Sequence, residues 1–284
     1  MSGAAGWLKA TVAALARIAP GPTARLALAL YRNPNVARRF DSGDREMLTV
    51  AEGIMAQGDV EWTETPEGRL RAFRFRPKGE PKGLVLLLHG WTADARAMAG
   101  FVEPLLAAGW SALIPDMPAH GDSFGKTTDA PHSARAVIAI LDGARPDRII
   151  GHSFGGGVMG MLATYGVTAP RAVSIASPSN IASSTDDFCA AFAMPPAAKA
   201  RFIALVDEAS GVPHADLDGL RIWPDQPTEM LILHAPDDAE VDFAEAERLA
   251  ALPNARLLPL PGLGHRRIVY DETSVSAAIA FIET

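Results

Sequence analysis

Short apolar runs alternate with helix-like segments along most of this chain. A solid apolar run of a few residues fits a strand that is covered on both faces. Such runs lie at 84–88, 111–114, 148–150, 172–175, 230–233 and 255–258. Other segments place apolar residues on one helical stripe and predict helices at 95–106, 134–141, 154–165, 243–252 and 275–282. This alternation predicts an α/β fold, in which a mostly parallel sheet carries helices on both faces.

Three regions depart from the alternation. Residues 60–63 and 70–76 are β-like and flank Thr65-Pro66-Glu67-Gly68, which predicts a hairpin. The stretch 178–227 contains several Pro and Gly residues, is mainly helical in pattern, and predicts a cap over the carboxyl edge of the sheet. The first ~55 residues predict short helices broken by prolines. The predicted units are an N-terminal helical extension (1–57), an α/β core (58–177 and 228–284) and a helical cap insertion (178–227).

Composition and charge narrow the function classes. The chain has 284 residues, of which 48% are hydrophobic, and this is enough for one large α/β domain with an insertion. Its net charge of −7 disfavours nucleic acid and anionic membranes as main partners. The single cysteine, Cys189, excludes an intramolecular disulfide and a zinc site made of cysteines.

The N-terminal segment has a weak likeness to a targeting signal. Lys9 precedes the apolar stretch 10–16, but Arg17 and Arg25 interrupt the pattern. No window reaches the ~18 apolar residues that an integral membrane span needs. We therefore expect a cytoplasmic protein. The apolar side chains of this segment are expected to pack on the core, with a partner subunit in a homodimer or a membrane surface as alternatives.

The most informative motif is Gly151-His152-Ser153-Phe154-Gly155. It follows a predicted strand and opens a predicted helix, so Ser153 falls at the apex of a sharp turn. A serine in such a turn has its hydroxyl exposed above the sheet, and the glycines permit the close approach of the chain to itself. The motif therefore predicts a nucleophile that attacks an acyl carbon.

A serine nucleophile requires a base and an acid, and the chain offers both after later strands. Asp237 and Asp238 follow the run 230–233, and His265 follows the run 255–258. The order serine, aspartate, histidine is the one expected with this type of strand-turn-helix nucleophile. From the residues alone, either aspartate could orient His265.

Together these motifs make the chain resemble an α/β-hydrolase with a cap, over roughly residues 60–284. The resemblance rests on His89-Gly90-Trp91, Asp116-x-Pro118-Ala119-His120-Gly121-x-Ser123, the Ser153 motif, Asp238-x-x-Val241 and Gly264-His265. The family's usual acid precedes a valine by three residues, which selects Asp238. The resemblance also implies that the backbone N–H groups of Trp91 and Phe154 form an oxyanion hole. Ala119 and Ala235 stand where many relatives carry glycine.

The expected function is hydrolysis of a carboxylic ester through an acyl-enzyme on Ser153, with no cofactor and no metal. Thioester, amide, lactone or C–C cleavage would use the same residues, and a non-catalytic ligand-binding role is the rival from another class. We expect a small-molecule substrate with a small-to-medium, mostly apolar acyl or alcohol group. The candidate pocket residues are Trp91, Phe188, Phe192, Phe202 and Trp223.

The remaining histidines near these motifs are expected to be structural. His89 and His234 end strands, and His120 belongs to a loop. His152 is expected to point away from Ser153, because neighbours on a strand face opposite sides. The same reasoning gives Asp116 a role in holding its loop.

Overall fold

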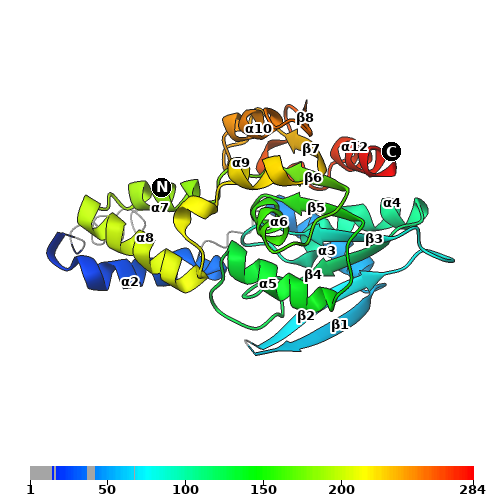
Figure 1. Cartoon of the computed structure of the whole chain (residues 1–284). Helices are drawn as coiled ribbons and strands as arrows, with labels where there is room; N and C mark the ends of the chain where they lie inside the picture. Colours follow the sequence, from blue (N-terminus) through cyan, green and yellow to red (C-terminus); the bar gives the residue numbers. More distant parts are fainter. Residues whose placement is uncertain (1–14, 16, 37–41, 67) are drawn as a thin grey trace.

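A sheet of eight strands forms the centre of the molecule in this computed structural model (Figure 1). The structure describes residues 15, 17–36, 42–66 and 68–284. The strands lie in the order β1-β2-β4-β3-β5-β6-β7-β8 across the sheet. Their bounds are Asp59–Thr65 (β1), Gly68–Phe75 (β2), Leu84–Leu88 (β3), Ser111–Pro115 (β4), Arg148–His152 (β5), Arg171–Ile175 (β6), Glu229–His234 (β7) and Ala255–Pro259 (β8).

The sheet is mostly parallel, as the sequence predicts. β1 pairs antiparallel with β2, and β2 pairs antiparallel with β4. From β4 through β3, β5, β6 and β7 to β8, each neighbouring pair is parallel. The predicted hairpin is therefore confirmed as the antiparallel edge of the sheet.

Helices cover both faces of the sheet and enclose two apolar layers. On one face lie α3 (Ser42–Met55), the 3₁₀ helix η2 (Ala95–Phe101), α4 (Val102–Ala107) and α12 (Glu272–Glu283). On the other lie α5 (Ala130–Leu141), α6 (Phe154–Thr164) and α10 (Phe243–Ala250). The helix predicted from residue 95 thus starts as a 3₁₀ helix, where the Asp94 carboxylate accepts the N–H of Arg96.

A helical insertion leaves the sheet between β6 and β7, in the range predicted for a cap. It contains α7 (Ser183–Ala191), α8 (Pro196–Ser210), η3 (His214–Asp216), α9 (Gly219–Ile222) and η4 (Trp223–Asp225). Its two ends pair, because the Gly219 N–H donates to the Ser179 carbonyl at 2.9 Å and the Ile181 N–H to the Leu217 carbonyl at 3.1 Å. Since β6 ends at Ile175, the insertion starts at the carboxyl edge of the sheet. Its standing as a separate cap domain stays a prediction.

The N-terminal helices divide between the core and the cap. α3 packs on the sheet through Ala51 and Met55, as expected. By contrast, α2 (Pro20–Tyr31) lies beside α8 (Figure 1), where Ala24 and Ala27 are buried against Phe202. Small alanine side chains let the two helices approach closely. The expectation of core packing therefore fails for α2, which packs on α8 of the helical insertion instead.

Tyr31 and Arg32 at the end of α2 join the cap to the core. The Tyr31 hydroxyl is 2.6 Å from Ser184 Oγ in α7, and burial raises the pKa of Tyr31 to about 12, so the phenol stays neutral. The Arg32 guanidinium pairs with Asp129 at 2.7 Å, and the Arg32 carbonyl accepts the Thr128 N–H at 2.8 Å. After this pair, the chain continues through η1 (Pro34–Val36).

The signal-peptide-like stretch from Lys9 lies outside the described residues, apart from Leu15. Among the helices that the structure describes, none combines the length and the apolar character needed to cross a bilayer.

Candidate active site

Ser153 occupies the sharp turn between β5 and α6. Its φ of +51° lies in the left-handed region, which is strained for a residue with a Cβ. The Ser153 N–H donates to the Ile175 carbonyl at 2.8 Å and so fixes the turn against the end of β6. A Cβ on Gly151 would come within 2.7 Å of the Gly155 carbonyl oxygen, and one on Gly155 would overlap the Leu88 carbonyl. The two glycines of the motif are therefore required by the packing of the turn.

His265 approaches Ser153 from the loop after β8. It lies in the short helix α11 (Gly264–Arg267), and Gly264 before it has a φ of +58°. The Nε2 atom of His265 is 3.0 Å from Ser153 Oγ. This is hydrogen-bond distance, so the imidazole is placed to accept the hydroxyl proton.

Asp238 lies on the other side of the imidazole. Its Oδ2 is 2.8 Å from His265 Nδ1 and 3.3 Å from His234 Nε2. Its Oδ1 accepts the backbone N–H groups of Glu240 and Val241 at 2.8 and 2.9 Å. Burial alone would raise the pKa of Asp238, but these hydrogen bonds outweigh it and hold the pKa well below its usual range. The carboxylate therefore stays charged and accepts a hydrogen bond from the Nδ1–H group of His265.

The structure separates the two candidate acids. Asp237 is exposed and its Oδ1 accepts the Gly262 N–H at 2.6 Å, so it ties the loop after β7 to the loop after β8. Asp238 is the aspartate that reaches His265. The arrangement therefore agrees with the choice that the Asp238-x-x-Val241 spacing suggested.

Trp91 and Phe154 lie together beside the serine turn. Their rings are 4.9 Å apart in an edge-to-face contact, and His120 packs 5.4 Å from Trp91 and 6.2 Å from Phe154. Among the described residues, neither backbone N–H has an acceptor within the protein. Two unused N–H donors beside a serine could bind a developing negative charge.

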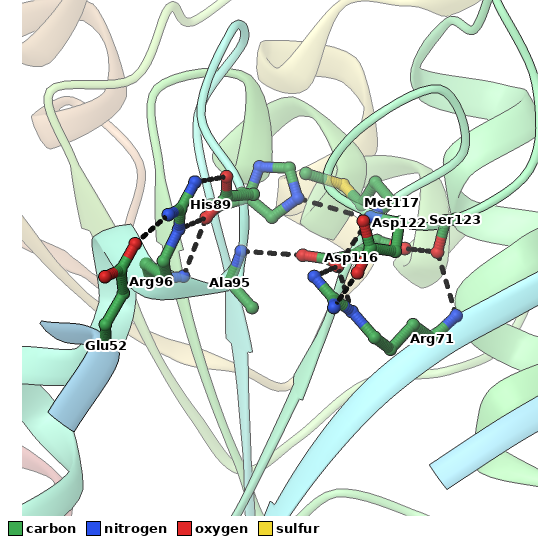
Figure 2. Close-up of polar contacts among 10 residues, drawn as sticks. Glu52, Arg71, His89, Ala95, Arg96, Asp116, Met117, Asp122 and Ser123 are labelled. Carbon is green, nitrogen blue, oxygen red and sulfur yellow. Dashed lines mark hydrogen bonds and ion pairs between the residues drawn. The ribbon is translucent and has the colours of Figure 1, made fainter. Parts of the chain in front are cut away.

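A largely buried polar network fixes the loop that carries Trp91. Figure 2 shows Asp116, at the end of β4, with Oδ1 accepting the Ala95 N–H at 2.9 Å and Oδ2 bound by Arg71. Asp122 also contacts Arg71, and its N–H donates to Asp116 at 3.2 Å. Asp116 is fully buried, so the hydrogen bonds that its carboxylate accepts are shielded from water, whereas the Arg71–Asp122 contact lies at the surface. The network joins β2, β4 and the loop after β3, which agrees with the structural role expected for Asp116.

His89 belongs to the same network. Its Nε2 accepts the Met117 N–H at 3.1 Å (Figure 2). Its Nδ1 lies 2.9 Å from the Gly90 carbonyl and donates to it. Burial lowers the pKa of His89 and keeps the ring neutral. Asp94 and Arg96 pair next to it, and Arg96 also reaches Glu52 of α3. These contacts hold the backbone before Trp91, and they agree with the structural role expected for His89.

The pattern of the alpha/beta hydrolase family matches residues 85–278, about two thirds of the sequence. The chain belongs to this family. The match begins at β3, so α2, α3 and the β1–β2 hairpin of this hydrolase lie outside it.

Part of this alpha/beta hydrolase is similar in sequence to curated proteins. It is 41% identical over 73 residues to the pimeloyl-[acyl-carrier protein] methyl ester esterase of Neisseria meningitidis, covering 25% of this chain and 27% of that protein. The matches thus span about a quarter of the length of the curated relatives.

Two solved esterases share its fold. The esterase RhEst1 from Rhodococcus sp. ECU1013 has a TM-score of 0.58 at 20% identity and covers 79% of this chain and 98% of its own. The esterase from Thermogutta terrifontis has a TM-score of 0.59 at 14% identity with coverage of 79% and 98%. At these identities the likeness concerns the fold.

His152 contributes a contact that the sequence did not predict. Its Nε2 lies 2.9 Å from the backbone carbonyl of His265 and donates to it, and the two rings are 5.0 Å apart. His152 therefore lies against the loop that carries His265, and the expectation that it points away from Ser153 stays a prediction. The contact joins the end of β5 to the loop after β8, and no spacing in the sequence predicts it. Burial and the neighbouring His265 lower the pKa of His152 to about 3.

This low pKa predicts a pH dependence of stability. Below its ordinary pKa of ~6.5, His152 binds a proton in the unfolded chain but not in the native protein until about pH 3, so stability falls as the pH falls. Between about pH 6 and pH 4, urea unfolding of the wild type should lose roughly 1.4 kcal/mol per pH unit more than His152→Gln. Glutamine does not titrate and keeps a donor toward the His265 carbonyl. Parallel slopes for the two proteins would contradict a neutral, buried His152.

The five predicted pocket residues have different positions. Trp91 contacts Phe154, next to Ser153. Phe188 packs against Phe192 and against Phe202, which is completely buried between α8 and α2. Trp223 packs between α6 and α10, at a small cavity of about 10 Å³. Phe202 and Trp223 thus make apolar packing contacts, and their contact with substrate stays a prediction. Substrate contact by Phe188 and Phe192 stays a prediction.

Two further features concern surface charges and metal binding. Arg267 contacts the Gly262 carbonyl and Arg266 pairs with Glu240 at 2.9 Å, both on the surface. In the part of the chain that the structure describes, no three or more His, Cys, Asp or Glu side chains gather in a way that could hold a metal ion.

Proposed function

We propose that this protein is a serine hydrolase that cleaves carboxylic esters through an acyl-enzyme on Ser153. The observation that carries the proposal is the continuous line of hydrogen bonds from Ser153 Oγ through His265 to Asp238, at 3.0 and 2.8 Å. A charged acid, an imidazole and a hydroxyl in this order are the components of nucleophilic acyl transfer. The family membership supports the same chemistry.

The first half of the reaction forms the acyl-enzyme. Ser153 Oγ attacks the ester carbonyl carbon while His265 Nε2 takes the hydroxyl proton. The carbonyl oxygen becomes negatively charged and accepts hydrogen bonds from the N–H groups of Trp91 and Phe154. Each such donor stabilises the transition state by about 3 kcal/mol. The tetrahedral intermediate then collapses, the ester C–O bond breaks, and the alcohol leaves with the proton from His265.

The second half releases the acid. Water attacks the acyl carbon as His265 takes one of its protons, and the bond to Ser153 Oγ breaks as the oxygen regains a proton. Asp238 stabilises the imidazolium in both halves of the reaction. The hydrogen bonds that it accepts from His234 and from the backbone keep its carboxylate ionised for this role. No other group is needed to balance protons or charge.

The proposed substrate is an ester with a small-to-medium, mostly apolar acyl or alcohol group. The rings of Trp91, Phe154 and His120 pack together beside the serine and would form an apolar wall there. The similar Neisseria protein is named for a methyl ester, in which the leaving alcohol is small. That resemblance covers a quarter of the chain and supports the ester bond only as a proposal.

A substrate panel tests the bond and the size of the acyl group. We expect kcat/KM for p-nitrophenyl butyrate and octanoate to be at least about tenfold above that for the palmitate. The reason is that a site for a small-to-medium acyl group does not accommodate the additional methylenes of palmitate. The panel should include thioester, anilide and lactone analogues of the best acyl group. A thioester that outperforms its matched ester after correction for intrinsic reactivity would reassign the bond.

The rival proposal, a ligand-binding protein without catalysis, makes a different prediction for covalent labelling. A fluorophosphonate probe reacts with an activated serine, so peptide mapping should find the label on Ser153. Absence of label on the folded protein would favour the binding protein over the hydrolase.

A further inference from the structure

The charge of this chain is distributed very unevenly. Residues 1–40 contain six basic residues and no Asp or Glu, whereas the rest of the chain carries the other 20 Lys and Arg against all 33 Asp and Glu. The six are Lys9, Arg17, Arg25, Arg32, Arg38 and Arg39. The net charge of −7 is therefore the sum of a basic N-terminal segment (1–40) and a strongly acidic body (41–284).

The described part of this segment exposes apolar side chains together with arginines. Ile18 is 82% exposed, and Leu26 and Leu15 are 48% and 45% exposed. Arg17 and Arg25 are exposed beside them, and no acidic partner is found for either among the described residues. By contrast, the charge of Arg32 is neutralised by Asp129. Exposed large aliphatic side chains next to unpaired arginines are typical of a surface that binds lipid.

The opposite side of α2 is already occupied. Ala24 and Ala27 are buried against α8, and Tyr31 is held between Phe188 and Phe202 by edge-to-face contacts at 5.3 and 5.5 Å. The exposed apolar residues are therefore additional to those that attach α2 to the cap. Because α2 and α8 lie in the same layer (Figure 1), whatever binds α2 lies next to the cap.

We propose that Leu15, Arg17, Ile18, Arg25 and Leu26 form a docking surface for an anionic phospholipid bilayer. Arginines attract the lipid phosphates, and the aliphatic side chains enter the boundary between headgroups and acyl chains. Repulsion of the acidic body from the same membrane orients the protein with its cap toward the lipid. Two other occupants fit this surface less well. Nucleic acid has phosphates but no apolar phase for Ile18 to enter. A second copy of the chain that binds through the same surface would place its own arginines against Arg17 and Arg25.

Docking to a membrane would supply the proposed hydrolase with substrate, and this part of the inference rests on the proposed function. The cap leaves the sheet at the carboxyl edge, which is also the edge where Ser153 lies. A protein bound through α2 holds this edge near the lipid, where apolar esters concentrate. The substrate class is then an ester that partitions into a membrane surface.

Vesicle binding of the full chain tests the docking without catalysis. We expect the protein to co-sediment with vesicles of phosphatidylcholine and phosphatidylglycerol, more weakly with phosphatidylcholine alone, and less in high salt. Each arginine near an anionic surface contributes about 1 kcal/mol, so Arg17→Gln with Arg25→Gln should weaken the partition coefficient by about 30-fold. Ile18→Ser should weaken it on both kinds of vesicle.

A matched control removes two charges from the other edge of the sheet. Lys78→Gln with Arg145→Gln alters exposed residues after β2 and before β5, far along the sheet from the cap insertion, and should leave binding unchanged. Equal binding by the two double variants, equal binding to both vesicles, or no binding at all would overturn the docking. A dimer in sedimentation velocity that Ile18→Ser dissociates, without vesicle binding, would assign the surface to a second copy instead.

Catalysis is measured separately. The wild type, the two surface variants and the control variant should all hydrolyse dissolved p-nitrophenyl butyrate at the same rate. On an octanoyl ester embedded in phosphatidylglycerol vesicles, the wild type and the control should be faster than the two surface variants. Vesicle binding without any hydrolysis would leave the docking in place and refute the proposed function. Hydrolysis of the dissolved ester without vesicle binding would do the reverse.

Discussion

Replacing Ser153 with alanine is expected to lower kcat for p-nitrophenyl esters by roughly five orders of magnitude or more, the scale on which serine hydrolases lose activity without their nucleophile. The reason is the loss of the covalent route, since His265 would be left without the hydroxyl that lies 3.0 Å from its Nε2. Stopped-flow release of p-nitrophenolate should also lose its initial burst. Substrate binding should change little, because alanine keeps the Cβ and the backbone turn.

The matched control is Ser177→Ala. Ser177 lies at the same edge of the sheet, just after β6, and its hydroxyl donates to the Ile175 carbonyl at 3.1 Å without contacting His265. We expect this variant to keep kcat within a small factor of wild type, with an unfolding temperature close to that of Ser153→Ala. Comparable activity in the two variants would mean that hydrolysis proceeds elsewhere on the protein.

Much of the architecture could be predicted because its signals are local. The run Leu84–Leu88 is apolar at every position, which is typical of a strand covered on both faces, and it is β3. The alternation of such runs with amphipathic helices requires parallel strands joined by crossovers. The candidate triad followed from the same logic, since Ser153, Asp238 and His265 each lie in the segment that follows a parallel strand, and these segments share one edge of the sheet.

The parts that could not be predicted depend on contacts between distant segments. α2 has the same apolar composition whether it packs on the sheet or on α8, so nothing in its sequence chooses the cap. Whether an aromatic such as Phe202 faces a pocket or a neighbouring helix is likewise decided by packing. The contact of His152 with the His265 carbonyl joins positions 113 residues apart, and no spacing rule predicts it.

The choice between the adjacent aspartates Asp237 and Asp238 also depends on contacts between distant segments. Asp238→Asn tests this choice and should cause a large loss of kcat. We expect kcat to fall by roughly four orders of magnitude. Each partner of Asp238 is a donor: His265 and His234 at Oδ2, and the N–H groups of Glu240 and Val241 at Oδ1. An asparagine that keeps its oxygen on the backbone donors turns its NH₂ toward His265. The imidazole must then accept at Nδ1 and carry its proton on Nε2, where it cannot take the proton of Ser153.

Asp237→Asn is the matched control, because it makes the same chemical change one residue away. Asp237 uses Oδ1 to accept the Gly262 N–H, and an asparagine oxygen can do the same. The change should therefore reduce kcat by less than about threefold, as surface substitutions outside such a site usually do little. Measured kcat values for the two variants, with KM near wild type in both, decide between the aspartates. A large loss in Asp237→Asn and a small one in Asp238→Asn would show that the loop after β7 rearranges before catalysis, since Asp237 would then have to exchange Gly262 for His265.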